Sequence, residues 1–284
     1  MQFAVYEQNG YHGLAVNQGD GFVGRLQGDP AYPGDLDLLV VEQANFTAVA
    51  HALAGGARLD LGAVRFLPPL PHPGKIICVG LNYADHSDET GFEIPSYPTI
   101  FARFTSSLVG HGDPILLPPQ SSQLDYEGEL VAIIGRGGRG IPKAEALDHV
   151  AGYSIFNDAT LRDYQFKTPQ WTMGKNFDNT GAFGPYFVPA AAVSAGCKGL
   201  RLQTRLNGQV VQDAAIDEMV FDVASQIALL SEVFTLAPGD IIVTGTPAGV
   251  GMARKPPLWM KVGDLCEVEI TGLGVLRNPI GVRS

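Results

Sequence analysis

The sequence has few cysteines and no long apolar run. Only three cysteines occur among 284 residues, at positions 78, 197 and 266. Their odd number and wide spacing give no zinc-binding pattern and fit a reducing cytoplasm. A transmembrane helix needs about 18 consecutive apolar residues, and none is present, so no membrane span is expected. The first residues lack the basic and apolar regions of a signal peptide.

Basic residues are also scarce. The chain has 19 Lys and Arg against 29 Asp and Glu, a formal net charge of −10. This charge repels phosphates and argues against nucleic acid or an anionic membrane surface as a partner. Apolar residues make up 45% of the chain, enough for a large core. The 35 glycines and 20 prolines, without a collagen repeat, indicate many turns and therefore many strands.

The pattern along the chain predicts a mainly β fold of the α+β class, with helices on the outside. The strands are predicted over residues 3–7, 12–16, 21–26, 75–80, 124–135, 151–157, 240–244 and 264–271. The helical patterns cover residues 46–53 and, most clearly, 222–236. Four prolines within residues 66–74 indicate a stiff connector. We therefore predict a small N-terminal α/β domain over residues 1–70 and a catalytic domain over residues 71–284.

The segment 124–135, Leu-Asp-Tyr-Glu-Gly-Glu-Leu-Val-Ala-Ile-Ile-Gly, is the most informative. Side chains alternate along a strand, so Glu127 and Glu129 share one face, with Cα atoms about 6.5–7 Å apart. Two such carboxylates beside core residues need neutralising, and a divalent cation does this well. Asp158, at the end of the next predicted strand, would be a third ligand. The alternatives are a solvated edge strand and a helix-capping role for Asp158.

His86 and Glu89 lie three residues apart, and on a helical turn they would be neighbours. A glutamate beside a histidine can orient the imidazole as a general base that acts on water. An ordinary contact on a surface turn is the alternative, and spacing alone favours it. The following loop, which contains Gly91, could close over a substrate.

A competing signal is the glycine pattern of residues 135–140, Gly-Arg-Gly-Gly-Arg-Gly, which follows a predicted strand. This pattern would suit a nucleotide-dependent oxidoreductase. Two features argue against it. The first strand of such a fold is buried on both faces and should not carry Glu127 and Glu129. In addition, Pro142 would fall inside the first helical turn.

Several segments together resemble the fumarylacetoacetate hydrolase family, specifically its bacterial two-part members. They cover most of residues 75–280 in the expected order, whereas residues 1–70 match only loosely. The resembling segments are KIICVGLNYADHSDE (75–89), LDYEGELVAIIG (124–135), YSIFNDATLRDYQ (153–165), WTMGKNFDNTGAFGP (171–185), MVFDVASQIALLSEVFTLAPGDIIVTGTPAGVG (219–251) and GDLCEVEITGLGVLRNPI (263–280).

The resemblance implies a mixed β-sandwich roll that holds one divalent cation, Mg²⁺, Mn²⁺ or Ca²⁺. By position, the family's metal ligands fall on Glu127, Glu129 and Asp158, and its water-activating pair falls on His86 and Glu89. Its enolate-stabilising cation falls on Lys175. The family's substrate-binding positions fall on Arg103, where lysine is more usual, and on Gln165, Gly245 and Thr246. A homodimer is also implied.

The resemblance further implies a hydrolase that cleaves a C–C bond in an acylpyruvate or β-diketo acid, such as fumarylpyruvate or a 2,4-diketo sugar acid. Its alternative is a decarboxylase, isomerase or hydratase that acts on the same kind of enolate from oxaloacetate-like or 2-oxo-dienoate substrates. Departures from the family pattern at residues 103, 157–163 and 179–183 surround the substrate. They leave the identity of the oxo acid open.

Overall fold

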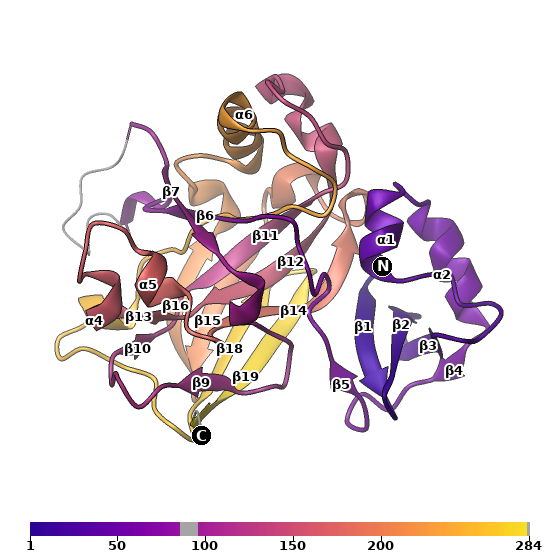
Figure 1. Cartoon of the computed structure of the whole chain (residues 1–284), viewed down its shortest axis with the longest axis horizontal. Coiled ribbons are helices and arrows are strands. Elements are labelled where there is room, and N and C mark those ends of the chain that lie inside the picture. The colour runs from indigo at the N-terminus through magenta and orange to yellow at the C-terminus, as the bar shows by residue number, and fades with distance from the viewer. Residues whose placement is uncertain (86–95, 283–284) are drawn as a thin grey trace.

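The computed structural model describes residues 1–85 and 96–282, and in this part of the chain two sheets form the core (Figure 1). One sheet has twelve strands and the other has five. The main path of the larger sheet runs β4-β3-β2-β1-β14-β12-β11-β17-β6-β7. The predicted class, mainly β with a few helices, is confirmed.

The N-terminal elements lie together at one end of the molecule (Figure 1). They are β1 (Phe3–Gln8), β2 (Tyr11–Asn17), β3 (Phe22–Leu26), α1 (Leu36–Val41), α2 (Phe46–Ala54), β4 (Ala57–Arg58) and β5 (Arg65–Phe66). The three strands and the helix predicted here are present, and α1 is an addition. Asn45 begins α2 by accepting hydrogen bonds from two backbone N–H groups. Because β1 pairs with β14 through Phe3 and Phe187, these strands extend the larger sheet.

The remaining strands of the larger sheet carry the candidate site. They are β6 (Ile76–Gly80), β7 (Thr99–Arg103), β8 (Leu108–Val109), β11 (Gly128–Ile134), β12 (Val150–Asp158), β14 (Gly181–Pro189) and β17 (Ile241–Val243). Strand β11 lies between β12 and β17 and is buried along its whole length. The strand predicted over residues 124–135 is interrupted, because residues 124–125 form the separate strand β10 (Leu124–Asp125) and pair with β13 (Thr160–Leu161).

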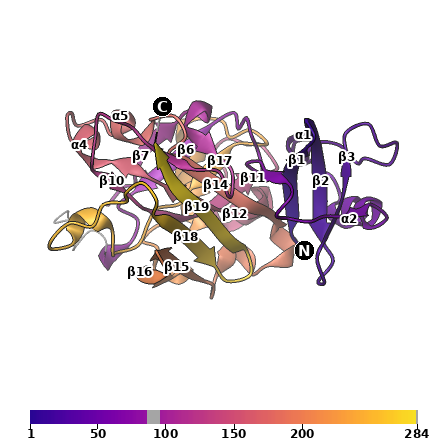
Figure 2. The same ribbon diagram turned by 90° about the horizontal axis from the view of Figure 1, so that it is seen from below.

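The five-stranded sheet packs against β11, β12 and β14 (Figure 2). Its strands are β9 (Ile115–Leu117), β15 (Arg201–Leu206), β16 (Gln209–Ala215), β18 (Leu265–Ile270) and β19 (Gly274–Val282). Because side chains alternate along β11, this strand contributes apolar residues to the core on both faces of the sheet. Leu130 and Ala132 join the cluster that includes this second sheet, whereas Val131 and Ile133 join the cluster that includes α1 and α2.

The helices after β7 are short. They are α4 (Arg162–Gln165), α5 (Thr172–Lys175), α6 (Val223–Val233) and the 3-10 helices η1 (Thr105–Ser107), η2 (Lys143–His149), η3 (Ala190–Ala192), η4 (Ala195–Cys197), η5 (Ile216–Glu218) and η6 (Gly251–Ala253). The predicted helix 222–236 is confirmed as α6. Asp222 caps it by accepting a hydrogen bond from the Ser225 backbone, and it ends three residues early, at Val233. Across the described residues, none of these helices has the length and apolar character to cross a membrane.

The glycine-rich segment 135–140 follows β11 and leads to η2, and the chain then returns as β12, antiparallel to β11. A dinucleotide site needs a helix that crosses between parallel strands. The segment is therefore a turn, and the nucleotide-dependent alternative is not supported.

Candidate active site

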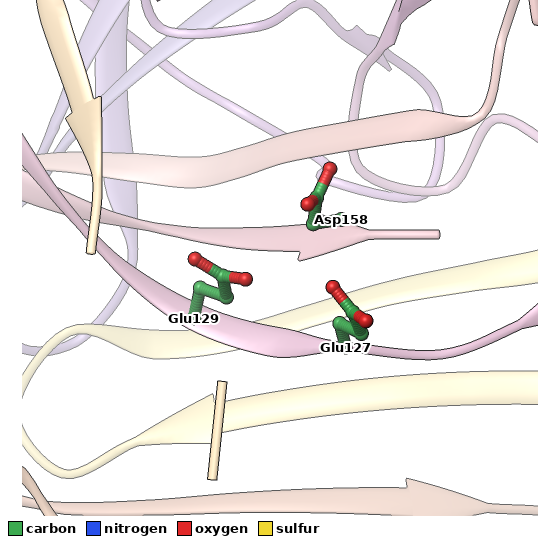
Figure 3. Close-up of side chains that lie close together, drawn as sticks. All are labelled: Glu127, Glu129 and Asp158. Atoms are coloured by element: carbon green, nitrogen blue, oxygen red, sulfur yellow. The ribbon is translucent and has the colours of Figure 1, made fainter. Parts of the chain in front are cut away.

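Three buried carboxylates meet at the junction of β11 and β12 (Figure 3). Glu127 directly precedes β11, Glu129 is its second residue, and Asp158 is the last residue of β12. The two segments are held together here because the Asp158 N–H donates to the Glu127 carbonyl at 2.8 Å. One ligand atom from each side chain lies within 4.8 Å of the other two. The exposed fractions are 4%, 2% and 0%. The structure thus brings together the three residues that the sequence predicted as neighbours.

Two of these carboxylates are bound by buried cations. Lys175, the last residue of α5, places Nζ 2.6 Å from Glu127 Oε2 and 2.7 Å from Asp158 Oδ2. Arg162 places Nη2 2.6 Å from Glu127 Oε1, and Arg103 pairs with Asp158 through Nε. Burial alone would lower the pKa of Lys175, but the charges of Asp158 and Glu127 outweigh it and raise this pKa. The ammonium group therefore stays charged.

Glu129 is different, because no ion pair is recorded for it among residues 1–85 and 96–282. Its Oε2 accepts a hydrogen bond of 2.6 Å from the Gly245 backbone N–H. Burial, together with the charges of Asp158 and Glu127, holds the pKa of Glu129 well above its usual value. A buried carboxylate without a cation is costly, and a divalent ion would remove that cost. Oxygen-only donors suit Mg²⁺, Mn²⁺ or Ca²⁺, so these residues fit the predicted metal.

A small pocket opens over the carboxylates. It is lined by Val79, Gly80, Leu81, Phe101, Glu127, Glu129, Arg162, Gln165, Phe166, Trp171, Lys175, Thr246 and Met252. Part of its wall is aromatic, where the Phe101 and Trp171 rings meet edge to face at 5.5 Å. A Cβ atom at Gly80 would collide with the Trp171 indole, so glycine is needed there to seat this ring. A polar end group would meet the charged floor, and the rest of a substrate would meet apolar walls.

The predicted substrate-binding residues divide into two groups. Gln165 and Thr246 line the pocket. The Gln165 Oε1 atom accepts a bond of 2.8 Å from Arg162 Nη1. The Gly245 backbone N–H donates a hydrogen bond to Glu129. Arg103 is not part of this pocket lining; it pairs with Asp158 and donates to the Ala159 carbonyl at 2.6 Å, and its role in binding substrate stays a prediction.

His86 and Glu89 lie outside the described residues. Their role as a water-activating pair stays a prediction.

Two further buried groups support the site, and the sequence did not predict either role. Asp125 accepts bonds from Arg162 Nε at 2.8 Å and from the Gly251 N–H at 2.7 Å. It stands two residues before Glu127, so the acidic run itself could have revealed it. Gln212 comes from β16, in the other sheet, and no local pattern marks it. Glycine is also needed at position 128, since a Cβ atom there would collide with Thr204 of β15.

Comparison with known proteins agrees with this geometry. Residues 75–281 match the family model described as fumarylacetoacetate (FAA) hydrolase C-terminal. The chain belongs to the fumarylacetoacetate hydrolase family. The resemblance inferred from the sequence motifs is thereby confirmed, over nearly the same residues.

Relatives in this family align with almost the whole chain. The human protein named oxaloacetate tautomerase FAHD2A, mitochondrial, is 39% identical over 285 residues, covering 99% of this chain and 90% of the relative. The rat protein of the corresponding name is 41% identical over 286 residues, with the same coverage.

Solved structures share the fold over their full length. A fumarylacetoacetate hydrolase from Exiguobacterium antarcticum superposes with a TM-score of 0.87 at 36% identity, covering 100% of both chains. A maleylpyruvate hydrolase from Sphingobium sp. SYK-6, in complex with manganese(II) and pyruvate, has a TM-score of 0.81 at 30% identity, again over 100% of both chains. With the buried carboxylates, this neighbour supports a divalent-metal site in an enzyme.

Proposed function

We propose that the chain is a divalent-metal-dependent enzyme that interconverts the keto and enol forms of oxaloacetate. The observation that carries this proposal is the buried trio of Glu127, Glu129 and Asp158, with Lys175 held between two of them. Such a site stabilises the negative charge of an enolate. The relatives named oxaloacetate tautomerase favour this reaction, because they match the chain at 39% and 41% identity over almost its whole length.

The chain's own residues would bind and orient the oxo acid. The three carboxylates would hold the metal, which supplies a Lewis acid for the 2-oxo carboxylate. Lys175 Nζ lies at the floor of the pocket and would offset charge that develops on the C-2 oxygen. The Gln165 amide would orient the substrate, and the aromatic walls would exclude water.

Tautomerisation moves a proton and breaks no carbon–carbon bond. A base removes a proton from C-3 of the keto form, the C-2 oxygen takes up a proton, and a C-2 to C-3 double bond forms. We propose the imidazole of His86, supported by Glu89, as the group that exchanges the C-3 proton. Both residues are present in the sequence at the spacing of a helical turn.

Hydrolytic cleavage of an acylpyruvate is the second candidate. The His86 and Glu89 pair suits the activation of water, and the maleylpyruvate hydrolase at 30% identity shares the fold. In that reaction hydroxide would add to the distal carbonyl, the bond between C-3 and C-4 would break, and C-3 would be protonated. The two reactions share an enolate but differ in their products.

A single set of assays separates the candidates. Metal-stripped protein is reloaded with Mg²⁺ or Mn²⁺ and mixed with oxaloacetate added as its enol, and the loss of enol absorbance is followed. Proton NMR in deuterium oxide then reports exchange at C-3. Parallel reactions with acetylpyruvate and fumarylpyruvate report cleavage to pyruvate and a carboxylic acid.

The proposal predicts metal-dependent loss of the enol with no pyruvate formed. Free metal ions act on oxaloacetate without protein, so metal alone and the Glu129→Gln variant are the matched controls. Pyruvate from oxaloacetate would instead identify a decarboxylase. Pyruvate from the acylpyruvates, without acceleration of the enol reaction, would establish the hydrolase.

We also propose that the chain forms a homodimer in the cytoplasm. Strand β7 is the last strand on the path of the larger sheet, and Ile100 on this strand is 37% exposed, with Phe104 just after it 55% exposed. Such apolar side chains beside the last strand of the sheet, as the described residues form it, favour association. Light scattering coupled to size-exclusion chromatography tests the dimer directly.

A further inference from the structure

Gln212 is a buried amide that joins the second sheet to the metal-ligand strand. It lies on β16 and is 2% exposed. Its Oε1 atom accepts a hydrogen bond of 3.0 Å from the Gly128 backbone N–H. Its Nε2 atom donates to Thr246 Oγ1 at 2.8 Å and to the Pro247 carbonyl at 2.9 Å. Because a backbone N–H only donates and a carbonyl only accepts, these partners leave one orientation for the amide.

A bulge in β16 turns this side chain inward. The pairing of β15 with β16 shifts between Thr204 and Arg205, so that Val211 has no opposite residue in the described ladder. Such a bulge re-aims the neighbouring side chains. As a result the consecutive residues Val211 and Gln212 are both buried, at 5% and 2% exposure.

Three hydrogen bonds link Gly128, Gln212 and Thr246 in a closed ring. The Thr246 hydroxyl accepts from Gln212, so its own proton is available for the Gly128 carbonyl, which lies 3.0 Å away. The ladder between β17 and β11 covers residues 131–133 of β11 and does not reach Gly128. The side chains of Gln212 and Thr246 therefore bond the Gly128 backbone where a partner strand would otherwise do so. Gly128 is the residue between Glu127 and Glu129, so the ring fixes the backbone that carries both carboxylates.

The same ring holds the loop of Gly245 and Thr246, which contacts Glu129. Thr246 follows Gly245, whose N–H donates to Glu129 Oε2. Gln212 therefore restrains both the backbone that carries Glu129 and the loop that orients its carboxylate. We propose that Gln212 is a positioning residue for metal binding, acting from the opposite sheet through Gly128 and Thr246. This inference rests on the proposed metal site.

The test compares two buried glutamines. Gln212→Met keeps the length of the side chain and removes all three hydrogen bonds. Gln226→Met is the matched control, since Gln226 is 1% exposed and donates to the Phe221 carbonyl at 2.8 Å and to the Thr244 carbonyl at 3.3 Å, neither of which belongs to the ring. Calorimetric titration of Mn²⁺ into metal-stripped protein gives the affinity, and thermal unfolding in EDTA gives the general cost of losing a buried amide.

The expected result is an Mn²⁺ affinity about 10–100-fold weaker in Gln212→Met, as for other groups that orient metal ligands. Gln226→Met should lose comparable thermal stability and keep wild-type affinity. Combining Gln212→Met with Thr246→Val should cost less affinity than the sum of the two, because either change opens the ring.

Wild-type Mn²⁺ affinity in Gln212→Met would overturn the positioning role alone, whereas a wild-type chain that binds no Mn²⁺ would overturn the metal site itself. If Gln212→Met fails to fold, hydrogen exchange on the wild type decides the matter. The ring predicts that the Gly128 amide is as protected as that of Ala132, which pairs with Ile242 of β17, and rapid exchange at Gly128 would contradict it.

Discussion

The ammonium group of Lys175 lies 2.6 Å from Oε2 of Glu127, with the two side chains only 2% and 6% exposed. Because the same nitrogen lies 2.7 Å from Asp158, one buried cation joins two of the three candidate metal ligands. Together with Arg103 and Arg162 it offsets much of the negative charge that the site concentrates. Glu129 is left as the carboxylate for which a metal ion would supply the positive charge.

Replacing Lys175 by methionine should remove activity and destabilise the metal-free protein. Breaking a buried ion pair costs about 3–5 kcal/mol, and the remaining arginines place the expected loss near 3 kcal/mol. Without the charge at the enolate, kcat should fall by about 100-fold or more. Urea unfolding and steady-state kinetics measure both effects. Lys261→Met, at an exposed position, is the control, and a Lys175→Met enzyme with wild-type kcat would remove Lys175 from the mechanism.

Gly181 makes room for the guanidinium that supports Asp158. A Cβ atom at this position would lie 2.7 Å from Arg103 Nη1 and 2.9 Å from Phe156 Cζ. Gly181→Ala should therefore cost about 1–3 kcal/mol of stability and weaken Mn²⁺ binding by about tenfold. Gly62→Ala, where the nearest atom lies at 3.4 Å, should change neither quantity.

A double variant identifies which clash matters at Gly181. Lysine at position 103 lacks the Nη1 atom, so Gly181→Ala with Arg103→Lys should cost less than the sum of the two single changes. Strict additivity would mean that Phe156, not Arg103, meets the new methyl group.

Local periodicity explains what the sequence predicted well. The alternation along β11 placed Glu127 and Glu129 on one face, and the spacing of Val223, Ile227 and Leu230 located α6, because both patterns depend on neighbours in the chain. The contact of Arg103 with Asp158 could not be derived in this way, since these residues are 55 positions apart.

The role of Gln212 could not be predicted from the sequence for the same reason. It is 84 positions from Gly128, and only a bulge and the packing of two sheets bring them together. The residue type carries no signal either, because a glutamine on a strand is ordinarily expected to be exposed.

His111 should make the fold sensitive to acid. Its Nδ1 atom accepts a hydrogen bond of 3.1 Å from the Arg277 backbone N–H, and its ring lies 5.0 Å from that of Phe66. Burial, with a smaller effect of the Arg277 charge, lowers the pKa of His111 to about 4. Because the folded state holds this ring neutral, the stability it contributes is present above the ordinary pKa of 6.5 and is lost as the pH falls toward 4.

The loss attributable to His111 is at most roughly 3 kcal/mol between these two pKa values. His111→Gln cannot titrate, so its free energy of unfolding should fall less steeply with acid. Urea unfolding at pH about 7 and about 4.5 measures the difference. The exposed His51 provides the control as His51→Gln. Equal acid sensitivity in wild type and His111→Gln would contradict this role.

Calorimetric titration of Mn²⁺ into metal-stripped wild type and Glu129→Gln tests the central claim most directly. Glutamine keeps an oxygen that can accept the bond from Gly245 and removes only the charge, so the fold should survive. Burial already raises the pKa of Glu129, so metal-free Glu129→Gln should unfold at or above the wild-type temperature. We predict saturable binding of one Mn²⁺ per wild-type chain and an affinity at least about 100-fold weaker in the variant. Equal affinity in the two proteins would contradict a metal site built on Glu127, Glu129 and Asp158.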